Sequence, residues 1–440
     1  NMCNTALIMG TGISGSGAAE LLLRNGWRVC VYDNAGARVP EGCEDRSFMP
    51  PELALRGVDL LVLSPGVPLT DEMVRYAKLC GTEVIGEIEL GYRYSKGDIV
   101  AVTGTNGKTT VTLLIKKILE CAGIRSYALG NIGASFSAVA DKVDENAVVV
   151  LELSSFQLES IADFRSRYAI CLNITPDHYE RHGSFAEYAD AKRKIFLNQT
   201  DGDFAILNYD DETVRSFERD VASGVYFFSA RQKVKGCYLD GGRIYFADKG
   251  VEYIAAADEL RIKGEHNVSN ALAAVTAAKL MGVDNRAIVK ALRTFSAPRF
   301  RMQYCGVIKG KRVYNDSKAT NIDSALKACA AMKGSTALIM GGYDKGISYE
   351  QFFAKLPSTV KRIVVTGDNA ESIRDDLPEK RGFAFEIAPS LYTAAVRAFE
   401  GDEENVLFSP STSSFDRYAD FEERGEAFDC IVRAIGCGEN

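Results

Sequence analysis

The sequence lacks any apolar run of the roughly 18 residues that a membrane-spanning helix needs, although 46% of its 440 residues are hydrophobic. It also lacks an excess of positive charge: the formal net charge is −7, whereas nucleic-acid-binding proteins usually carry basic surfaces. No secretory leader pattern opens the chain. We therefore expect a cytoplasmic monomer with no membrane span and no nucleic-acid partner.

The chain also has few of the cysteine and histidine patterns that are typical of zinc sites and disulfide frameworks. The eleven cysteines are scattered and form no C-x-x-C pair, which favours reduced thiols. Only three histidines occur. His178 and His182 have the i, i+4 spacing of a zinc helix, but Glu180 is displaced by one position from the H-E-x-x-H pattern. We therefore discount zinc.

The sequence does contain three series of apolar runs that alternate with helical patterns. Such alternation favours βαβ units and parallel sheets. The string CYLDGGRIYF instead places a glycine turn between two alternating runs and predicts a hairpin. We expect an α/β protein of three domains: residues 1–92, Rossmann-like; 93–297, a central P-loop domain with a mainly parallel sheet and a small hairpin; and 298–440, Rossmann-like.

The string AVTGTNGKTTVT at residues 101–112 ends like a P-loop, but Val102 stands where the usual pattern has its first glycine. The nearest glycine is Gly104. The string lies between a plausible strand and a helical pattern, where free backbone N–H groups attract phosphate. In such a loop Lys108 would neutralise the terminal phosphates and the Thr109 hydroxyl would ligate Mg²⁺. A tight turn capped by threonines is the alternative.

Two acid–base side chains follow later apolar runs. Glu152 lies toward the end of the run AVVVLEL, and His178 comes just beyond the run YAICLNI. Because ligands gather outside the carboxyl ends of parallel strands, we expect Glu152 to hold a metal ion, and His178 could face the same cleft. A surface or helix-cap glutamate is the alternative for Glu152.

Several strings in this order resemble the motifs of the Mur ligases over nearly the whole chain. They are GTNGKTT at 104–110, GNIG at 130–133, LELSSFQLE at 151–159, NITPDH at 173–178, YADAKRKI at 188–195, GEHNVSNALAA at 264–274 and YNDSKATN at 314–321. That family carries the shortened loop GTNGKT, which accounts for the position of Gly104.

The resemblance implies the activity. The C-terminal stretch LFSPSTSSFDRYADFEERG is similar to that of the D-glutamate-adding members. Such an enzyme phosphorylates the carboxylate of UDP-N-acetylmuramoyl-L-alanine with ATP, and the amine of D-glutamate then attacks the acyl phosphate, in peptidoglycan precursor synthesis. A carboxylate that approaches a triphosphate needs cations to offset the repulsion. The implied cofactors are ATP and one or two Mg²⁺ ions.

The resemblance also implies the residues of the ATP and metal sites. The catalytic set is Lys108, Glu152, His178 and Lys192. The ATP set is Gly104, Thr105, Asn106, Gly107, Lys108, Thr109, Thr110, Asn270, Arg301 and Asp316. The metal set is Thr109, Glu152, His178 and, if carbamylated, Lys192.

Two further sets follow from the same resemblance. The set for the UDP substrate is Ile13, Ser14, Asp33, Asn34, Gly66, Asn131 and Ser154. The set for D-glutamate is Lys318, Thr320, Lys345, Ser414 and Phe421.

At two positions the resemblance does not decide the role of the residue. Carbamylation of Lys192 would turn a cation into an oxygen anion and would need a depressed pKa. An ordinary surface lysine on a charged helix is the alternative. The family usually shows His-Arg-x-Glu where this chain has FRMQ at 300–303, so Arg301 is retained but its neighbours differ, and Phe300 could simply be core.

Other functions remain open. Gly10, Gly12 and Gly15 form G-x-G-x-x-G, with Asp33 about 20 residues further on, which is the fingerprint of an NAD-dependent dehydrogenase. A folylpolyglutamate synthase shares the central and final domains, but here a whole predicted domain precedes the P-loop. Other Mur-type ligases, which add diamino acids, carry a D-N-P-R string that this chain lacks. A nucleotide-sensing protein would need the loop without a metal-bound carboxylate.

Overall fold

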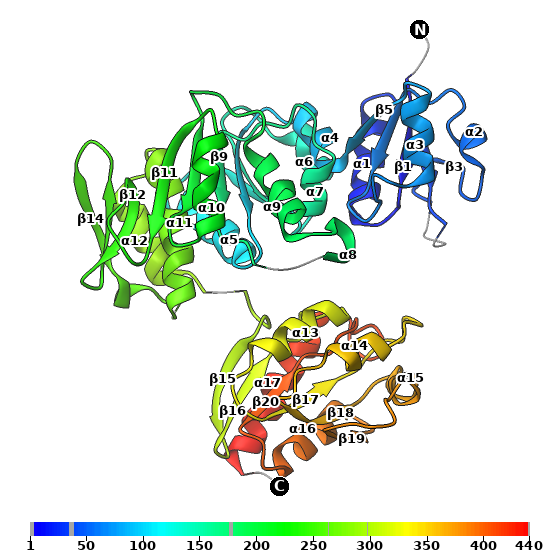
Figure 1. Cartoon of the computed structure of the whole chain (residues 1–440), viewed down its shortest axis with the longest axis vertical. Coiled ribbons are helices and arrows are strands. Elements are labelled where there is room, and N and C mark those ends of the chain that lie inside the picture. Colours follow the sequence, from blue (N-terminus) through cyan, green and yellow to red (C-terminus); the bar gives the residue numbers. More distant parts are fainter. Residues whose placement is uncertain (1–3, 35–38, 176–178, 263, 297, 439–440) are drawn as a thin grey trace. The chain divides into compact units, whose positions relative to one another are not determined.

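A computed structural model of the chain describes residues 4–34, 39–175, 179–262, 264–296 and 298–438. These residues form three β-sheets with helices packed against them (Figure 1). Residues 1–297 make one compact unit, which holds two of the sheets, and residues 298–440 make a second unit, which holds the third.

The first sheet is built from the short apolar runs near the N-terminus. Its strands are β1 (Thr5–Met9), β2 (Arg28–Tyr32), β3 (Glu44–Asp45), β4 (Leu60–Leu63) and β5 (Glu83–Gly86). All pair in parallel, in the order β3-β2-β1-β4-β5. Every residue of β1 and β4 is buried, as expected for strands covered on both faces.

Four helices accompany this sheet. They are α1 (Ile13–Arg24), α2 (Pro51–Ala54), α3 (Glu72–Leu79) and α4 (Glu87–Tyr94). The start of α3 follows from its sequence, because the Asp71 carboxylate accepts the Met73 N–H and caps the helix.

The second sheet has nine strands. They are β6 (Asp98–Thr103), β7 (Ser126–Gly130), β8 (Val148–Glu152), β9 (Tyr168–Cys171), β10 (Phe204–Asn208), β11 (Gly224–Ser229), β12 (Gly236–Asp240), β13 (Arg243–Ala247) and β14 (Val251–Ala256). Their order is β14-β13-β12-β11-β10-β9-β6-β8-β7. Pairing is parallel from β12 to β7 and antiparallel from β12 to β14.

The antiparallel edge confirms the predicted hairpin. Strands β12 and β13 are joined by Gly241 and Gly242, whose φ angles are 54° and 75°. Two consecutive residues with positive φ are what a tight two-residue hairpin turn requires, and glycine adopts them without steric cost.

The second sheet is accompanied by α-helices and by short 3₁₀ turns. The α-helices are α5 (Lys108–Cys121), α6 (Phe136–Val139), α7 (Ser155–Glu159), α8 (Tyr179–His182), α9 (Phe185–Arg193), α10 (Glu212–Ser216), α11 (Glu265–Leu280) and α12 (Asn285–Thr294). The 3₁₀ turns are η1 (Ala140–Lys142), η2 (Lys194–Phe196), η3 (Phe217–Asp220) and η4 (Ala257–Glu259).

The third sheet forms the second unit. Its strands are β15 (Gln303–Ile308), β16 (Lys311–Asn315), β17 (Thr336–Met340), β18 (Val360–Val365), β19 (Ala384–Ile387) and β20 (Asn405–Phe408). Its helices are α13 (Ile322–Ala331), α14 (Glu350–Lys355), α15 (Ala370–Asp375), α16 (Leu391–Glu400) and α17 (Phe421–Cys437). The order is β15-β16-β20-β17-β18-β19. Within the described residues of this sheet, only the β15–β16 pair is antiparallel.

The first two sheets share one hydrophobic core. Leu22 of α1 and Phe136 of α6 belong to the same buried cluster. Gly91 of α4 lets the Phe136 ring approach, because a Cβ at that position would lie 2.6 Å from the ring. The buried carboxylate of Glu89 accepts the N–H groups of Ala162 and Phe164, each at 2.8 Å. These contacts hold α4 against α6 and against the segment of Ala162 and Phe164, and so fix the first sheet relative to the second.

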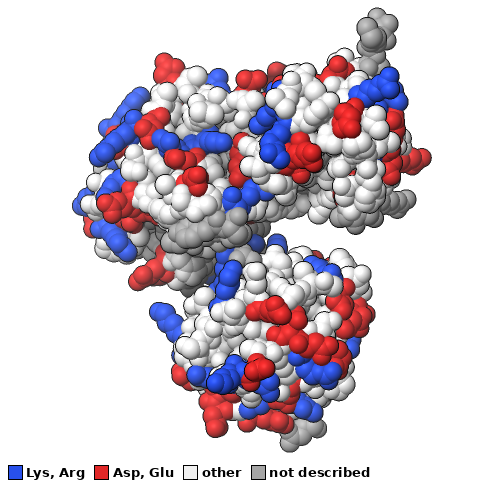
Figure 2. Space-filling view, turned by 45° about the vertical axis from the view of Figure 1, so that its right-hand side comes forward, with Lys and Arg blue, Asp and Glu red and all other residues white. Residues whose placement is uncertain are grey.

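The predicted α/β fold with mainly parallel sheets is confirmed. The division into three domains at residues 92 and 297 stays a prediction. Within the described ranges, every helix is too short or too polar to span a lipid bilayer. Figure 2 shows Lys and Arg interspersed with Asp and Glu on the visible face.

Candidate functional site

The glycines of the predicted P-loop lie where the chain needs them. Strand β6 ends at Thr103 and helix α5 begins at Lys108. Gly104 has φ +147°, and a Cβ on it would lie 2.9 Å from Leu172 Cβ. Gly107 has φ +86° and caps the N-terminus of α5. The loop therefore joins the end of a strand to the N-terminus of a helix, which is the arrangement that binds phosphate.

Lys108 folds over this loop. Its Nζ donates to the carbonyl oxygens of Gly104 and Thr105, both at 2.9 Å. The neighbouring strand fixes the loop from the other side, because Thr105 N donates to Asn173 O and Asn106 N donates to Asn173 Oδ1, both at 2.8 Å. Asn173 was absent from the predicted site residues, although it lies in the NITPDH string.

Lys192 of α9 reaches the same loop. Its side chain is 1% exposed, and its Nζ donates to Gly104 O at 2.9 Å. The Nζ lies 4.8 Å from the centre of the Tyr188 ring, whose hydroxyl is 3.1 Å from Thr105 Oγ1. The alternative of an ordinary surface lysine is therefore wrong, since Lys192 is buried against the P-loop.

Glu152 ends β8, the strand paired beside the P-loop strand, where Val102 is its partner. It is 1% exposed, so a surface glutamate is excluded. Its Oε1 accepts from Asn131 Nδ2 at 3.1 Å. Its Oε2 is buried and has no hydrogen-bond partner among the described residues. A buried carboxylate oxygen without a donor carries a desolvation cost that a cation would remove.

The residues present fit a magnesium ion. No three His, Cys, Asp or Glu side chains that could hold a metal come together in the described part of the chain. Mg²⁺ needs no such cluster, because it commonly takes one or two carboxylates and completes its shell with phosphate and water. The orphaned oxygen of Glu152 and the hydroxyl of Thr109, in the first turn of α5, are oxygen ligands of the kind that such an ion would take.

Two more predicted residues of the first unit lie close to these groups. Asn270 of α11 packs on the P-loop, since a Cβ on Gly107 would lie 2.4 Å from its Oδ1. The Ser154 hydroxyl accepts from Gln157 N at 3.3 Å and caps α7, directly after the Glu152 strand.

The predicted histidine ligand, His178, lies outside the described residues. His182 is described and nearly buried. Its Nε2 is 2.9 Å from Ser155 Oγ, and its Nδ1 is 3.3 Å from Glu159 Oε1. His182 therefore braces α8 against α7.

The first sheet brings together the residues predicted for the UDP end of a substrate. The Asp33 Oδ2 accepts from Thr11 N at 2.7 Å and from Thr11 Oγ1 at 2.8 Å, which ties the end of β2 to the glycine turn after β1. Ile13 is 74% exposed and Ser14 is half-buried at the start of α1. A helix N-terminus beside a carboxylate is the arrangement that nucleotide-binding folds use.

Phe48 and Arg181 were not predicted, but both contact predicted residues. The Phe48 N–H donates to Asn34 Oδ1 at 2.8 Å, and Phe48 is 74% exposed with φ +61°. No sequence signal marks Phe48. Arg181 of α8 donates to Gly66 O at 3.3 Å and to Val67 O at 3.1 Å, so the loop after β4 is joined to the central sheet.

In the second unit, Arg301 lies in a tight turn before β15. Met302 N donates to Asp316 Oδ1 at 2.9 Å, and Lys318 N donates to Phe300 O at 2.9 Å. Phe300 is 1% exposed and is a core residue. Burial raises the pKa of Asp316 to about 6, although hydrogen bonds from Met302 and Ser409 oppose the shift. Arg301 and Asp316 are thus held side by side.

Four of the residues predicted for D-glutamate also come together. The Lys318 ammonium lies 5.3 Å from the centre of the Phe421 ring, and Lys345 Nζ donates to Thr320 O at 3.0 Å. Burial lowers the pKa of Lys345, and the nearby Arg424 acts in the same direction. Lysine ammonium groups are point charges that can pair with carboxylates.

Arg424 of α17 organises the loop that carries Ser414, the fifth predicted residue. It is 2% exposed and donates to Ser317 O at 2.9 Å, to Thr412 O at 3.0 Å and to Ser413 O at 3.0 Å. Burial lowers its pKa to about 10. Arg424 was not predicted, although it lies in the FEERG string.

Comparison with known proteins agrees with this arrangement. Residues 102–278 match the Mur ligase middle domain, and residues 300–412 match the domain described as Mur ligase, glutamate ligase domain. The chain is 40% identical over 98% of both chains to a UDP-N-acetylmuramoylalanine–D-glutamate ligase from Pelotomaculum thermopropionicum. It is 38% identical over 96% of both chains to a protein of the same name from Caldanaerobacter subterraneus subsp. tengcongensis.

Solved structures share the fold at lower identity. A UDP-N-acetylmuramate–alanine ligase from Thermotoga maritima has a TM-score of 0.54 at 20% identity, with 98% of this chain and 99% of that chain covered. A pseudomurein peptide ligase type C from Methanothermus fervidus has a TM-score of 0.53 at 18% identity, with 98% and 100% covered. Together with the matched domains and the full-length relatives, these findings show that the chain belongs to the Mur ligase family.

Proposed function

We propose that this chain is an ADP-forming amide ligase that uses ATP to join D-glutamate to UDP-N-acetylmuramoyl-L-alanine, in peptidoglycan precursor synthesis. The observation that supports this most directly is the buried Glu152 Oε2, which has no hydrogen-bond partner among the described residues and lies on the strand beside the P-loop. The name of the full-length relatives supports the choice of substrates, and it argues against a dehydrogenase.

ATP binds at the P-loop in this proposal. The loop from Gly104 to Thr110 holds the phosphates at the N-terminus of α5, and Lys108 exchanges its two loop carbonyl bonds for the terminal phosphates. Asn270, which packs on Gly107, contacts the adenine. Arg301 and Asp316 supply the remaining phosphate and ribose contacts.

Glu152 and Thr109 would hold Mg²⁺ in this proposal, with His178 as a further ligand. When bound, Mg²⁺ offsets the negative charge that builds up between the triphosphate and the substrate carboxylate. Lys192 carries a carbamate in this proposal, and the carbamate oxygens would supply further anionic ligands for the same ions.

The remaining predicted residues bind the two other substrates in this proposal. Ile13, Ser14, Asp33, Asn34 and Gly66 bind the UDP end, and Asn131 and Ser154 bind nearer to Glu152. Lys318, Thr320, Lys345, Ser414 and Phe421 bind D-glutamate, with the two lysines paired to its carboxylates.

The chemistry then proceeds in two steps. A carboxylate oxygen of UDP-N-acetylmuramoyl-L-alanine attacks the γ-phosphorus of ATP, and ADP leaves, which gives an acyl phosphate. The amine of D-glutamate attacks the acyl carbon, phosphate leaves, and the amine gives up a proton as the amide forms. Lys108 stabilises charge in the first step, because its ammonium faces the phosphates. We also propose that the protein acts as a cytoplasmic monomer.

A substrate panel tests this proposal. Purified protein is incubated with ATP, Mg²⁺ and UDP-N-acetylmuramoyl-L-alanine, and each reaction receives D-glutamate, L-glutamate, L-lysine or meso-diaminopimelate. Release of phosphate and formation of the amide should require D-glutamate. Turnover with a diamino acid but not with D-glutamate would overturn the choice of amino acid, and phosphate release without any amino acid would indicate a different activity.

A further inference from the structure

The turn that carries Arg301 is strained. Phe300 has φ 61° and Met302 has φ 45°, so non-glycine residues on both sides of Arg301 adopt the left-handed region. Bulky side chains rarely adopt this conformation, and it persists only where the surroundings hold it. The contacts that hold this turn therefore decide where the Arg301 guanidinium lies.

One set of contacts fixes the backbone of the turn. The Phe300 N–H donates to Gln303 Oε1 at 3.0 Å, and the Met302 N–H donates to Asp316 Oδ1 at 2.9 Å. The Phe300 ring packs on Gly425 of α17, where an added Cβ would lie 2.4 Å from the ring. Gln303 is thus the side chain that satisfies the backbone on the N-terminal side of Arg301.

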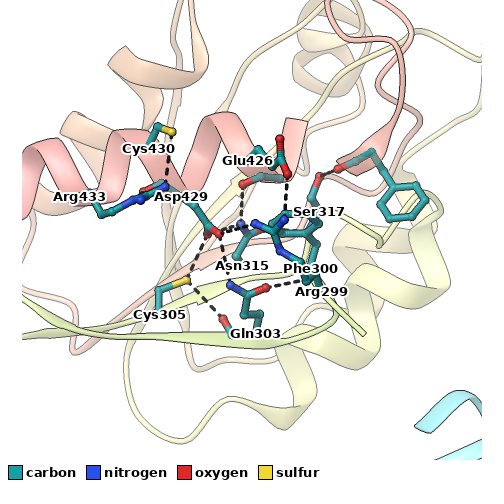
Figure 3. Close-up of polar contacts among 12 residues, drawn as sticks. Arg299, Phe300, Gln303, Cys305, Asn315, Ser317, Glu426, Asp429, Cys430 and Arg433 are labelled. Atoms are coloured by element: carbon teal, nitrogen blue, oxygen red, sulfur yellow. Dashed lines mark hydrogen bonds and ion pairs between the residues drawn. The ribbon is translucent and has the colours of Figure 1, made fainter. Parts of the chain in front are cut away.

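A second set of contacts fixes Gln303 itself (Figure 3). Its Nε2 donates to Asp429 Oδ2 at 3.3 Å, while Asp429 Oδ1 accepts from Asn315 Nδ2 at 2.7 Å. The Cys305 thiol also donates to Asp429 Oδ1 at 3.6 Å, and burial raises the pKa of that thiol to about 12. Each of these neighbours of the carboxylate is a donor, and so is Arg299, which lies 3.8 Å from Oδ2.

We infer that Gln303 and Asp429 are a matched pair of positioning residues, which together hold the Arg301 turn in the shape that receives ATP. The role in ATP binding rests on the proposed function, whereas the pairing rests on the contacts alone. The amide of Gln303 is needed because one end must accept from the Phe300 N–H and the other must donate to Asp429.

A swap of the two functional groups tests this pairing. Gln303→Glu keeps the acceptor for the Phe300 N–H but places two carboxylates in contact. In Asp429→Asn, the amide oxygen must face the Asn315 NH₂ group, which donates at that position. The new NH₂ group of residue 429 therefore faces the NH₂ group of Gln303. Each single variant should raise the KM for ATP about tenfold, the effect of one uncompensated contact of about 1.4 kcal/mol. The double variant restores a donor facing an acceptor and should return the KM to within about twofold of the wild type.

Two further readouts separate positioning from general damage. The KM for UDP-N-acetylmuramoyl-L-alanine should stay unchanged in all variants, because its predicted binding residues lie in residues 1–297. Gln351→Glu adds the same charge at an exposed position of α14 and should leave every constant unchanged. Thermal melting of each variant confirms that assays are run well below unfolding.

The outcomes distinguish this inference from the proposed function. Single variants with wild-type KM for ATP, or a double variant that is no better than the singles, would overturn the pairing even if the wild type makes the expected amide. If the wild type makes no amide, ATP affinity measured by calorimetry takes the place of KM. Restored affinity in the double variant would then support the pair while the proposed function fails, and unchanged affinity in the singles would overturn both.

Discussion

At the scale of single residues, the site depends on buried charges that the protein alone does not fully satisfy. Glu152 is the clearest case. Asn131 donates to one of its oxygens, and the other has no hydrogen-bond partner among the described residues. An oxygen of this kind costs free energy in the absence of a cation. The protein therefore carries a local cost that ligand binding removes.

Replacing Glu152 by glutamine should separate binding of metal from folding. The glutamine side chain keeps an acceptor for Asn131 but loses the negative charge, so ATP turnover should fall at least about a hundredfold while the melting temperature stays equal or rises. Phosphate release and thermal unfolding measure the two effects. Glu145→Gln, at an exposed position, is the control. Wild-type turnover in the Glu152 variant would exclude this residue as a metal ligand.

Asp316 predicts a dependence of stability on pH. Its folded pKa, about 6, is raised by burial above the ordinary value of about 3.9. The folded protein therefore binds more protons than the unfolded chain between these values, and stability falls as pH rises through that window. Above pH 6 the full cost is present, on the order of 3 kcal/mol.

Asp316→Asn is the matched test. Asparagine keeps the acceptor for the Met302 N–H, and the Ser409 hydroxyl can rotate to accept from its NH₂ group. Denaturant unfolding at intervals from pH 4 to 7 should show the wild type losing stability relative to the variant as pH rises. A constant difference across this range would contradict the raised pKa.

At the scale of elements, short helix α8 joins the two sheets of the first unit. The Arg181 guanidinium donates to the carbonyls of Gly66 and Val67 and to Glu159 Oε2 at 2.7 Å, and it lies 5.0 Å from the Phe156 ring. Arginine suits this position because its planar fork satisfies several acceptors at once.

Arg181→Lys should therefore raise the KM for UDP-N-acetylmuramoyl-L-alanine several-fold, about 0.5–1.5 kcal/mol for a lost hydrogen bond, and should leave the KM for ATP nearly unchanged. Lysine keeps the positive charge but lacks the planar guanidinium group that donates to several acceptors. Steady-state kinetics with each substrate varied in turn measure the split. Arg193→Lys, in exposed ion pairs with Asp190 and Asp220, is the control. Equal changes in both KM values would argue against a specific role at the substrate loop.

The elements also show how far the sequence alone leads. The P-loop, strand β8 and the β12–β13 hairpin could be predicted, because glycine positions and apolar runs act locally. Strand β7, with the sequence SYALG, was not predicted, since only its pairing with β8 distinguishes it from a loop. The contact of Gln303 with Asp429 joins residues 126 positions apart and has no local signal. Contacts of this kind depend on the sheet order, which the sequence pattern does not specify.

At the scale of the whole molecule, the predicted ATP residues are divided between the two compact units. Lys108 belongs to residues 1–297, and Arg301 belongs to residues 298–440. If both contact one ATP molecule, binding must bring them to the same ligand, and joints between units of this kind commonly hinge. We expect small-angle scattering to show a smaller radius of gyration with a non-hydrolysable ATP analogue and UDP-N-acetylmuramoyl-L-alanine. Identical curves with and without these ligands would contradict closure.

The most direct test concerns Lys108, because the whole account places its ammonium on the terminal phosphates of ATP. Lys108→Met keeps most of the apolar stem and removes the ammonium, together with its hydrogen bonds to the Gly104 and Thr105 carbonyls, and we expect the protein still to fold. The measurement is amide formation from ATP, UDP-N-acetylmuramoyl-L-alanine and D-glutamate by the two proteins at equal concentration. We predict a loss of at least about a thousandfold in the variant. Amide formation at a rate close to that of the wild type would contradict the account.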